Sequence, residues 1–400
     1  MSYTTEQRAQ AAAWKATTEC LPIIAREPAA YINKTGSADG PAHEFCLPAA
    51  YADLNLLPEV RARALSLFGE LSIPWHAGVG AGPSNHLLSS QAQCVNALGQ
   101  MVTDPERIIR AFGSLLGIEK VLEIEPGRFL TFEYIGPKDY FREVPNGARI
   151  RGAHCTSVDA AFLHRALDGV TELVLVEWKY TESYKLRTPD PERDAVRHGR
   201  YGRAVADPVG PVRDDVLPFE LLLDEPFYQL VRQQLLAHAL EKDCAEGAGR
   251  VRVVHVAPAG NQAYQNSVHR PEQTAVGASV TEVWNRLLRH PDRFLSLDSA
   301  VFANPELTSR GYALRYADDV IYDQAGLIVA FELLTADELE VVLYADHEFD
   351  GDVTVTDTDV ELLVGREGTF LSYPFTVTEL RELAAELAVE PVEDTDPAVG

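Results

Sequence analysis

Apolar residues in the first third of the chain recur every three to four positions, which is the spacing typical of helices. This pattern predicts helices over residues 5–18, 58–71 and roughly 86–101. A further helix is expected to begin after Asp104, because Asp is a favoured N-cap residue and Pro105 suits the first turn. We therefore expect the N-terminal part of the chain to be mainly helical.

Strand-like patterns begin after residue 128. They predict three strands, over residues 129–135, 153–165 and 171–180. The third is almost continuously apolar, which is typical of a strand at the centre of a sheet. The dipeptide Asp168-Gly169 separates the last two strands and favours a hairpin turn between them.

The pattern then returns to helix and strand in turn. A helix is predicted over residues 225–241 and a strand over residues 251–256. Ser279 and Glu282 form a capping box for one more helix. The expected fold class is α/β, with a core in the order helix, three strands, helix, strand.

Charge is distributed unevenly along the 400 residues. The chain has a formal net charge of -25, of which residues 317–400 contribute -20 and residues 1–316 only -5. Such asymmetry is typical of a domain boundary or an acidic appendage. We expect a mainly helical N-terminal extension (1–85), a core (86–316) and a small acidic α+β domain (317–400). This last domain should contain short strands and a helix capped by Thr376 and Glu379.

Composition excludes several classes of protein. No apolar run approaches the ~18 residues that a membrane span needs, and the chain does not begin with the pattern of a secretory signal. We therefore expect a cytoplasmic protein with no membrane partner. The five cysteines are scattered without a CxxC pair, which argues against a disulfide framework and against a zinc site.

Glu177 and Lys179 are unusual because they lie within the most apolar predicted strand. A buried carboxylate or ammonium is costly unless it is paired, bound to a metal or placed at the edge of a site. Side chains alternate along a strand, so both charges should point to the same face. The spacing therefore predicts that the two groups act at one place.

A second carboxylate should face this pair. In an antiparallel hairpin that turns at Asp168 and Gly169, Asp159 lies opposite Glu177, with their Cβ atoms roughly 5 Å apart. Two carboxylates at this distance repel each other unless a cation lies between them, and carboxylate oxygens with room for water suit Mg²⁺ or Mn²⁺. Lys179 would add a cation able to hold a phosphate or a water molecule. This set fits phosphodiester hydrolysis. The alternative is a salt bridge between Glu177 and Lys179, with Asp159 on a solvated hairpin.

Asp159, followed by Glu177, Trp178 and Lys179, resembles the D...(D/E)xK signature of the PD-(D/E)xK nuclease superfamily, which has the restriction-endonuclease-like fold. The blocks NHLLSSQAQCVNAL, RGAHCTSVDAAF, LVLVEWKYTESY and PFYQLVRQQLLAHAL are similar to those of a group of bacterial restriction endonucleases, so the resemblance covers about residues 45–317. It implies that Asp159, Glu177 and the main-chain carbonyl of Trp178 bind a metal. It also implies that Lys179 positions or deprotonates the water.

The chain departs from the superfamily pattern in one respect. Members often have Pro directly before the Asp, or a Glu on the first core helix, whereas this chain has Val158 and a polar run at residues 89–93. A third acidic ligand is therefore unassigned. Glu133, in the strand-like run TFEYIG, is the candidate, and residues 86–316 are the expected nuclease core.

Basic and polar residues around this core are candidates for nucleic-acid binding. Four arginines would form one stripe on a helix, which could hold a phosphate backbone or could be a solvated face paired with nearby acids: Arg193, Arg197, Arg200 and Arg203. Arg149 and Arg151 precede the Asp159 strand and have the same two interpretations. On the helix over 225–241, a polar edge either lines the substrate groove or faces solvent: Gln229, Arg232 and Gln233.

Taken with the resemblance, the residues predict a Mg²⁺- or Mn²⁺-dependent endonuclease acting on DNA, in restriction or phage defence. One rival is a module that binds nucleic acid but does not cut it. Another gives the acidic residues 317–400 the role of a partner-binding region or a DNA mimic that regulates the site, against a simpler role as a solubilising domain. A homodimer would suit double-strand cutting.

Overall fold

The computed structural model describes residues 2–144, 147–304 and 306–317, together with the backbone of five strands between Ile328 and Thr376. The chain divides into two compact units, residues 1–320 and 321–400. The division lies close to the point at which the acidic sequence begins.

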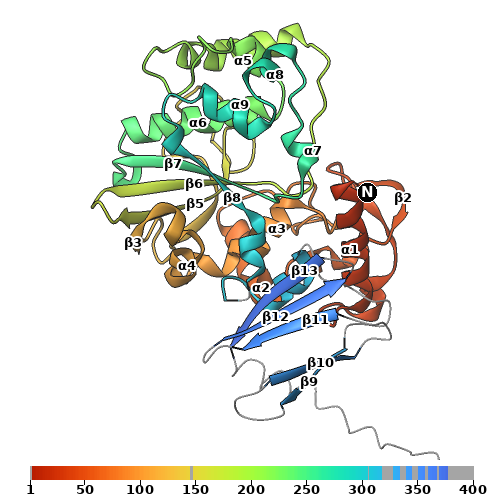
Figure 1. The fold of residues 1–400 in the computed structure, drawn as a ribbon. Helices are drawn as coiled ribbons and strands as arrows, with labels where there is room; N and C mark the ends of the chain where they lie inside the picture. Colours follow the sequence, from red (N-terminus) through yellow and green to blue (C-terminus); the bar gives the residue numbers. More distant parts are fainter. Residues whose placement is uncertain are drawn as a thin grey trace, which may run out of the picture. The chain divides into compact units, whose positions relative to one another are not determined.

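The first unit is a mixed α/β structure built on one six-stranded sheet (Figure 1). Its strands are β3 (Ile118–Leu122), β4 (Leu130–Tyr134), β5 (Val158–Ala166), β6 (Thr171–Trp178), β7 (Arg250–Ala257) and β8 (Phe294–Asp298). The order is β3-β5-β6-β7-β8, and β4 also pairs with β5. Pairs on the β5 side are antiparallel, whereas β6, β7 and β8 run parallel to one another. The predicted α/β class is confirmed.

The hairpin of β5 and β6 has the predicted turn and register. Ala160 pairs with Val176, and the same offset continues to the turn. There Gly169 has a φ of 82°, which glycine adopts without the strain that a side chain would cause. The Asp168 carboxylate accepts a hydrogen bond from the Val170 N–H at 3.1 Å. The first strand begins at Val158, five residues later than expected.

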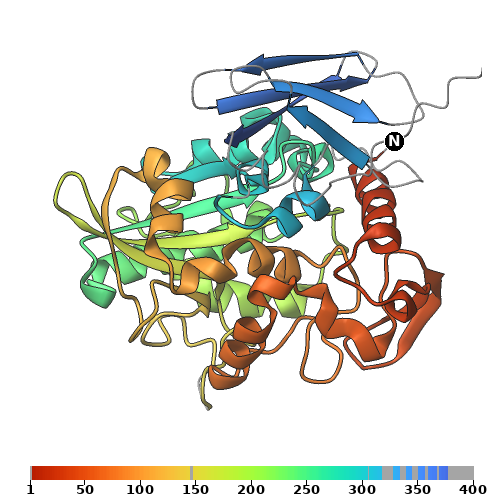
Figure 2. The same cartoon turned by 90° about the horizontal axis from the view of Figure 1, so that it is seen from below.

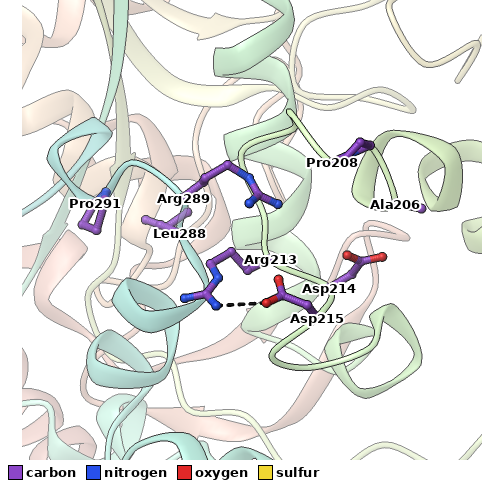
Figure 3. A pocket seen from close by; sticks show the side chains of 8 residues that line it. All are labelled: Ala206, Pro208, Arg213, Asp214, Asp215, Leu288, Arg289 and Pro291. Atoms are coloured by element: carbon purple, nitrogen blue, oxygen red, sulfur yellow. Dashed lines mark hydrogen bonds and ion pairs between the residues drawn. The ribbon is translucent and has the colours of Figure 1, made fainter.

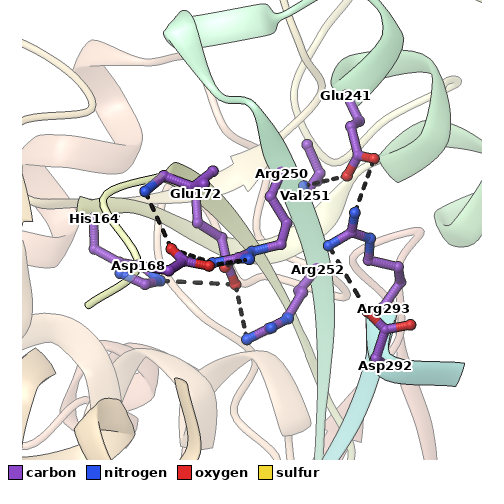
Figure 4. A network of polar contacts seen from close by, with 10 residues as sticks. His164, Asp168, Glu172, Glu241, Arg250, Val251, Arg252, Asp292 and Arg293 are labelled. Atoms are coloured by element: carbon purple, nitrogen blue, oxygen red, sulfur yellow. Dashed lines mark hydrogen bonds and ion pairs between the residues drawn. The ribbon is translucent and has the colours of Figure 1, made fainter. Parts of the chain in front are cut away.

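A buried charge network lies near this turn, at the end of the hairpin far from Glu177 (Figure 4). The Glu172 carboxylate is fully buried, and the Arg250 Nε donates to it at 2.5 Å. An Arg252 nitrogen lies 3.4 Å from Glu172 and the His164 ring 3.8 Å from it. Burial alone would raise the pKa of Glu172, but these basic neighbours lower it. The network therefore satisfies a charge that the core could not otherwise hold.

Helices cover both faces of the sheet (Figure 1). On one face lie α3 (Ser90–Leu98) and α4 (Pro105–Leu116), with the Phe112 ring 5.0 Å from that of Phe162 on β5. On the other lie α5 (Pro191–Val205), α6 (Phe227–Lys242) and α9 (Val280–Leu287), whose apolar side chains share a core with those of β6. In the described part of the chain, no helix is both long enough and apolar enough to cross a membrane.

Two predicted helix starts are confirmed by their caps. The Asp104 side chain accepts a hydrogen bond from the Glu106 N–H and begins α4 with Pro105 in its first turn. Ser279 accepts from the Glu282 N–H and begins α9. In contrast, α3 begins at Ser90, later than the predicted residue 86, because Ser89 provides the cap.

The N-terminal region contains α1 (Tyr3–Thr17) and α2 (Pro58–Glu70), close to the predicted helices. It also contains a hairpin that was not expected, of β1 (Ala29–Ile32) and β2 (Ala38–His43). Helix α1 stands at the end of the sheet opposite the β5–β6 turn (Figure 2). There the Tyr180 hydroxyl donates to Gln7 at 2.7 Å, directly after the predicted site on β6. The unit also contains three short α-helices, α7 (Gln262–Gln265), α8 (Pro271–Val276) and α10 (Arg310–Tyr316), and several short 3-10 helices.

In the second unit, only strands are described. One antiparallel pair consists of β9 (Ile328–Leu333) and β10 (Leu339–Tyr344). The other sheet contains β11 (Asp350–Val355), β12 (Asp359–Arg366) and β13 (Thr369–Thr376), again antiparallel. The helix predicted to follow Thr376 lies outside the described residues.

Candidate active site

The pairing of β5 with β6 brings Asp159 and Glu177 to neighbouring positions. Backbone pairing of the two strands reaches Ala160 and Val176, and the next step of the same register places Asp159 opposite Glu177. Asp159 also bonds directly to the second strand, because its Oδ2 accepts a hydrogen bond from the backbone N–H of Trp178 at 2.7 Å. The predicted juxtaposition of the two carboxylates is therefore present.

The register extends this row of polar side chains to four strands. On β4, Phe132 pairs with Ala160 and Tyr134 with Val158, so Glu133 lies opposite Asp159. On the other side, β7 pairs with β6 so that His255 lies opposite Glu177. Glu133, Asp159, Glu177 and His255 thus follow one another across the sheet.

Asp159 carries an electrostatic cost in this row. Burial, together with the charges of Glu177 and Glu133, raises the pKa of the Asp159 carboxyl well above its usual range, despite Lys179 and the bond from Trp178. Its Oδ1 has no hydrogen-bond partner among the described residues. One oxygen of the carboxylate is therefore without a hydrogen bond from the described residues, and Lys179 compensates its negative charge only in part.

Glu177 is only 2% exposed, and three side chains donate to it. The Lys179 ammonium lies 2.5 Å from its Oε1, and the Gln229 amide nitrogen lies 2.6 Å from the same oxygen. The Gln233 amide donates to Oε2. Burial alone would lower the pKa of Lys179, but the charge of Glu177 and weaker contributions from nearby groups raise it well above its usual range. Lys179 is therefore held as an ammonium beside the carboxylates.

Glu133 has an unusual backbone. Its φ is 48°, in the left-handed region that non-glycine residues rarely adopt, although it lies within β4. Its carboxylate accepts hydrogen bonds from the Gln91 amide at 3.0 Å and from the Ser157 hydroxyl at 2.8 Å. A Cβ on the neighbouring Gly152 would lie only 3.0 Å from this carboxyl group. Burial, mainly, raises the pKa of Glu133. Such local strain is typical of functional sites.

The carboxylates have the chemistry of a site for a hard divalent cation, although the described residues contain no group of three or more His, Cys, Asp or Glu arranged to hold a metal. Asp159 offers a free oxygen, and the adjoining carboxylates on either side raise its pKa. A cation at Asp159 would relieve this repulsion, and Mg²⁺ and Mn²⁺ prefer oxygen ligands of this kind. Carboxylate oxygens of this kind would suit Mg²⁺ or Mn²⁺.

The four arginines predicted as a stripe do lie on one helix, α5, but they do not share one exposed face. Arg193, Arg200 and Arg203 are exposed. Arg197 is only 5% exposed, donates to the Leu223 carbonyl at 2.5 Å and stacks 3.9 Å from the Tyr228 ring. It points inward because it lies one turn before Tyr201 on the buried face of the helix.

The other predicted basic residues differ in how far they are already engaged. Arg149 donates to the carbonyls of Ile135 and Gly136, and Arg151 pairs with Glu125 at 2.5 Å, so both hold the loop before β5. Arg232 stacks 5.1 Å from the Tyr228 ring and has no hydrogen bond or ion pair with the described residues. Of these three, Arg232 is the one whose guanidinium is not engaged by a carbonyl or a carboxylate of the described residues.

Sequence reasoning did not identify His255 or Gln91 as neighbours of the site. His255 is 3% exposed, and its Nε2 lies 3.0 Å from the Tyr264 hydroxyl. Burial and the nearby Lys179 lower its pKa to about 3, so the ring is neutral. A His within the apolar run VRVVHVA was an available signal, whereas the bond from Gln91 to Glu133 depends on tertiary structure alone.

A surface hollow elsewhere in the unit is lined by none of the predicted site residues (Figure 3). It is formed by Ala206, Pro208, Arg213, Asp214, Asp215, Leu288, Arg289 and Pro291. Arg213 pairs with Asp215 at 2.9 Å there, so its charge is already balanced. The hollow is therefore distinct from the row of carboxylates.

Residues 7–316 match the family model described as Restriction Endonuclease associating with ARP. The chain belongs to this family. The match confirms the resemblance to restriction endonucleases and includes nearly all of the N-terminal region. No curated protein and no solved structure matches the chain. Membership of this family suggests a nuclease-like function.

Proposed function

We propose that the protein is a divalent-metal-dependent endonuclease that hydrolyses phosphodiester bonds in DNA, and that it acts in the cytoplasm in restriction or phage defence. The observation that carries the proposal is the row of Glu133, Asp159 and Glu177 on three neighbouring strands, with the Lys179 ammonium beside it. When α4, β3 and α5 are counted as additions, the order α3, β4, β5, β6, α6 and β7 is compatible with the restriction-endonuclease-like core of helix, three strands, helix, strand.

Each residue has a proposed task. Asp159 and Glu177 hold Mg²⁺ or Mn²⁺, with the carbonyl of Trp178 and the Glu133 carboxylate as further ligands. The metal, when bound, polarises the phosphate and lowers the pKa of a water molecule. Lys179 holds the attacking water or a phosphate oxygen near the carboxylates and offsets negative charge that develops during hydrolysis.

DNA binding in this proposal uses guanidinium groups that the fold leaves free. Gln229 on α6 contacts both Glu177 and Lys179. Arg232 lies about one turn farther along the same helix, where it would contact a phosphate near the site. The exposed Arg193, Arg200 and Arg203 on α5 would contact the backbone farther away.

A protein partner is part of the proposal because the family description includes association with ARP. The acidic residues 317–400 lie outside the family match and are a candidate contact for a partner. A homodimer would bring two sites to the two DNA strands.

The proposal is tested by incubating the protein with supercoiled plasmid, linear duplex and single-stranded DNA, each with Mg²⁺, Mn²⁺ or EDTA. We expect metal-dependent cleavage of plasmid and duplex, abolished by EDTA. The pattern of nicked, linear or degraded product identifies the mode of cutting. Binding of DNA without cleavage under any metal condition would instead favour a module that binds nucleic acid and does not cut it.

A further inference from the structure

Two glutamines of α6 contact the candidate catalytic residues directly. Gln229 and Gln233 are one helical turn apart, so their side chains lie on the same face of α6 and point toward β6. Both amide groups donate to the Glu177 carboxylate, one to each oxygen. Among the described residues, Gln233 is the one side chain that donates to Oε2. Together they determine how this carboxylate is oriented.

Gln229 also links Glu177 to Lys179. Its amide nitrogen donates to Glu177 Oε1 at 2.6 Å, while its amide oxygen accepts from the Lys179 ammonium at 2.9 Å. A carboxylate can only accept and an ammonium can only donate, so one orientation of the amide satisfies both groups. Gln229 therefore holds the ammonium close to the carboxylate through a bond that does not depend on the ion pair itself.

We propose that Gln229 and Gln233 are positioning residues that orient Glu177 and Lys179 for metal binding and catalysis, rather than residues that contact DNA. The inference rests on the proposed metal-dependent function. Gln233 is 1% exposed and cannot reach a nucleic acid without local unfolding. Residues that orient metal ligands in this way typically change metal affinity or activity by 10–100-fold when they are replaced.

The chain supplies a matched control on the same helix. Gln234 follows Gln233 directly, is 3% exposed and has no hydrogen bond to a described residue. Replacing either glutamine by methionine removes a buried amide and keeps a side chain of similar length. Gln233→Met and Gln234→Met therefore differ in one respect that matters here, which is the bond to Glu177. Gln229→Met, at a half-buried position that tolerates change more easily, provides a second test.

The experiment first measures Mn²⁺ binding to each full-length protein by calorimetry without DNA. It then measures kcat and KM for DNA cleavage in Mn²⁺ and, separately, DNA affinity in Ca²⁺. We expect Gln233→Met and Gln229→Met to weaken Mn²⁺ binding and lower kcat by about 10–100-fold each, with DNA affinity within about two-fold of wild type. Gln234→Met should match the wild type in all of these. Thermal melting checks that each variant is folded, and Gln229→Met carries the test if Gln233→Met does not fold.

Two results would overturn the inference. If Gln229→Met or folded Gln233→Met binds Mn²⁺ as the wild type does but loses DNA affinity, the glutamines contact substrate instead. If both variants equal Gln234→Met in every measurement, the bonds to Glu177 have no functional role. A wild-type protein that cleaves DNA while these comparisons fail leaves the proposed function standing, whereas a wild type that binds no Mn²⁺ and does not cleave overturns both.

Discussion

Asp159 shows how a single residue can serve function at the expense of stability. Its carboxylate lies beside Glu177 and opposite Glu133, and its pKa is raised well above the usual range by burial and by these charges. Without a cation, the ionised form is therefore destabilising. Groups with perturbed pKa values of this kind cluster at functional sites, where activity and stability have opposite requirements.

Asp159→Asn is therefore expected to stabilise the metal-free protein while abolishing its activity. The asparagine side-chain oxygen can still accept from the Trp178 N–H, but it carries no charge. We expect an increase of about 0.5–2 kcal/mol in the free energy of unfolding at pH 7 in EDTA. Because the folded-state pKa of Asp159 is raised, the wild type loses stability as pH rises from about 4, the ordinary Asp pKa, toward the folded-state pKa. The difference in stability between the wild type and Asp159→Asn should therefore vanish near about pH 4.

Denaturant unfolding of both proteins between pH 4 and pH 7 measures this difference. Asp168→Asn is the control with the opposite sign, because Arg250 and the Val170 N–H lower the pKa of Asp168 to about 2. The stability from Asp168 is present above about pH 4 and is lost as pH falls toward 2, so its variant should be the less stable at pH 7. A wild type more stable than Asp159→Asn at pH 7 in EDTA would contradict the account.

At the scale of elements, the β5–β6 hairpin was predictable because its signals are local. The Asp-Gly turn sets the register, and the register alone places Asp159 opposite Glu177. The cap at Asp104 is equally local. The inward direction of Arg197 was not predictable, because it depends on which face of α5 packs against the core.

Other features of the site depend on strands that carry weak signals. The short edge strands β3 and β8 were not predicted, since five residues of partly exposed sequence give little periodicity. Glu133 was a candidate from its residue type alone, and only the pairing of β4 with β5 places it beside Asp159. The bonds from Gln229 and Gln233 to Glu177 require the packing of α6 on the sheet, which a single sequence does not specify.

The far end of the same hairpin provides a stability prediction. Glu172→Ala removes the buried carboxylate that balances Arg250 and Arg252. Arg252 then loses its ion-pair partner, and Arg250 keeps only Asp168, whose side chain is largely exposed. Breaking a buried ion pair on one side typically costs about 3–5 kcal/mol. Because Glu172 is five residues from Glu177 and on the opposite face, roughly 17 Å along the strand, the folded variant should cleave DNA at the wild-type rate.

Thermal and urea unfolding, followed by cleavage assays below the melting temperature, test this prediction. Glu119→Ala is the control, because Glu119 is exposed on β3 and its loss should change stability by less than about 0.5 kcal/mol. Equal stability of the two variants would show that the Glu172 network does not hold the hairpin.

At the scale of the whole molecule, the total net charge does not describe the part of the chain that holds the candidate site. Most of the -25 belongs to residues 317–400, whereas residues 1–316, which hold the site, carry only -5. The two compact units divide near the same point, and the family match ends at residue 316. The acidic part is thus separable in sequence, in contacts and in family membership.

Deleting residues 321–400 is expected to leave metal-dependent cleavage intact and to change DNA affinity by less than about two-fold at 0.15 M salt, because exposed charges are strongly screened at this ionic strength. Fluorescence anisotropy with labelled duplex, in EDTA and over a range of salt concentrations, measures the change. A large gain in affinity on deletion would instead mean that the acidic residues compete with DNA for the site.

The central claim is that Asp159, Glu177 and Lys179 form a metal-dependent site for phosphodiester hydrolysis. Its most direct test is the initial rate of plasmid cleavage in Mg²⁺ by the wild type, Asp159→Ala and Lys179→Ala, with thermal melting to check that each is folded. We predict that the wild type cleaves and that each folded variant is slower by about 100-fold or more. Cleavage at the wild-type rate by either variant would contradict the account.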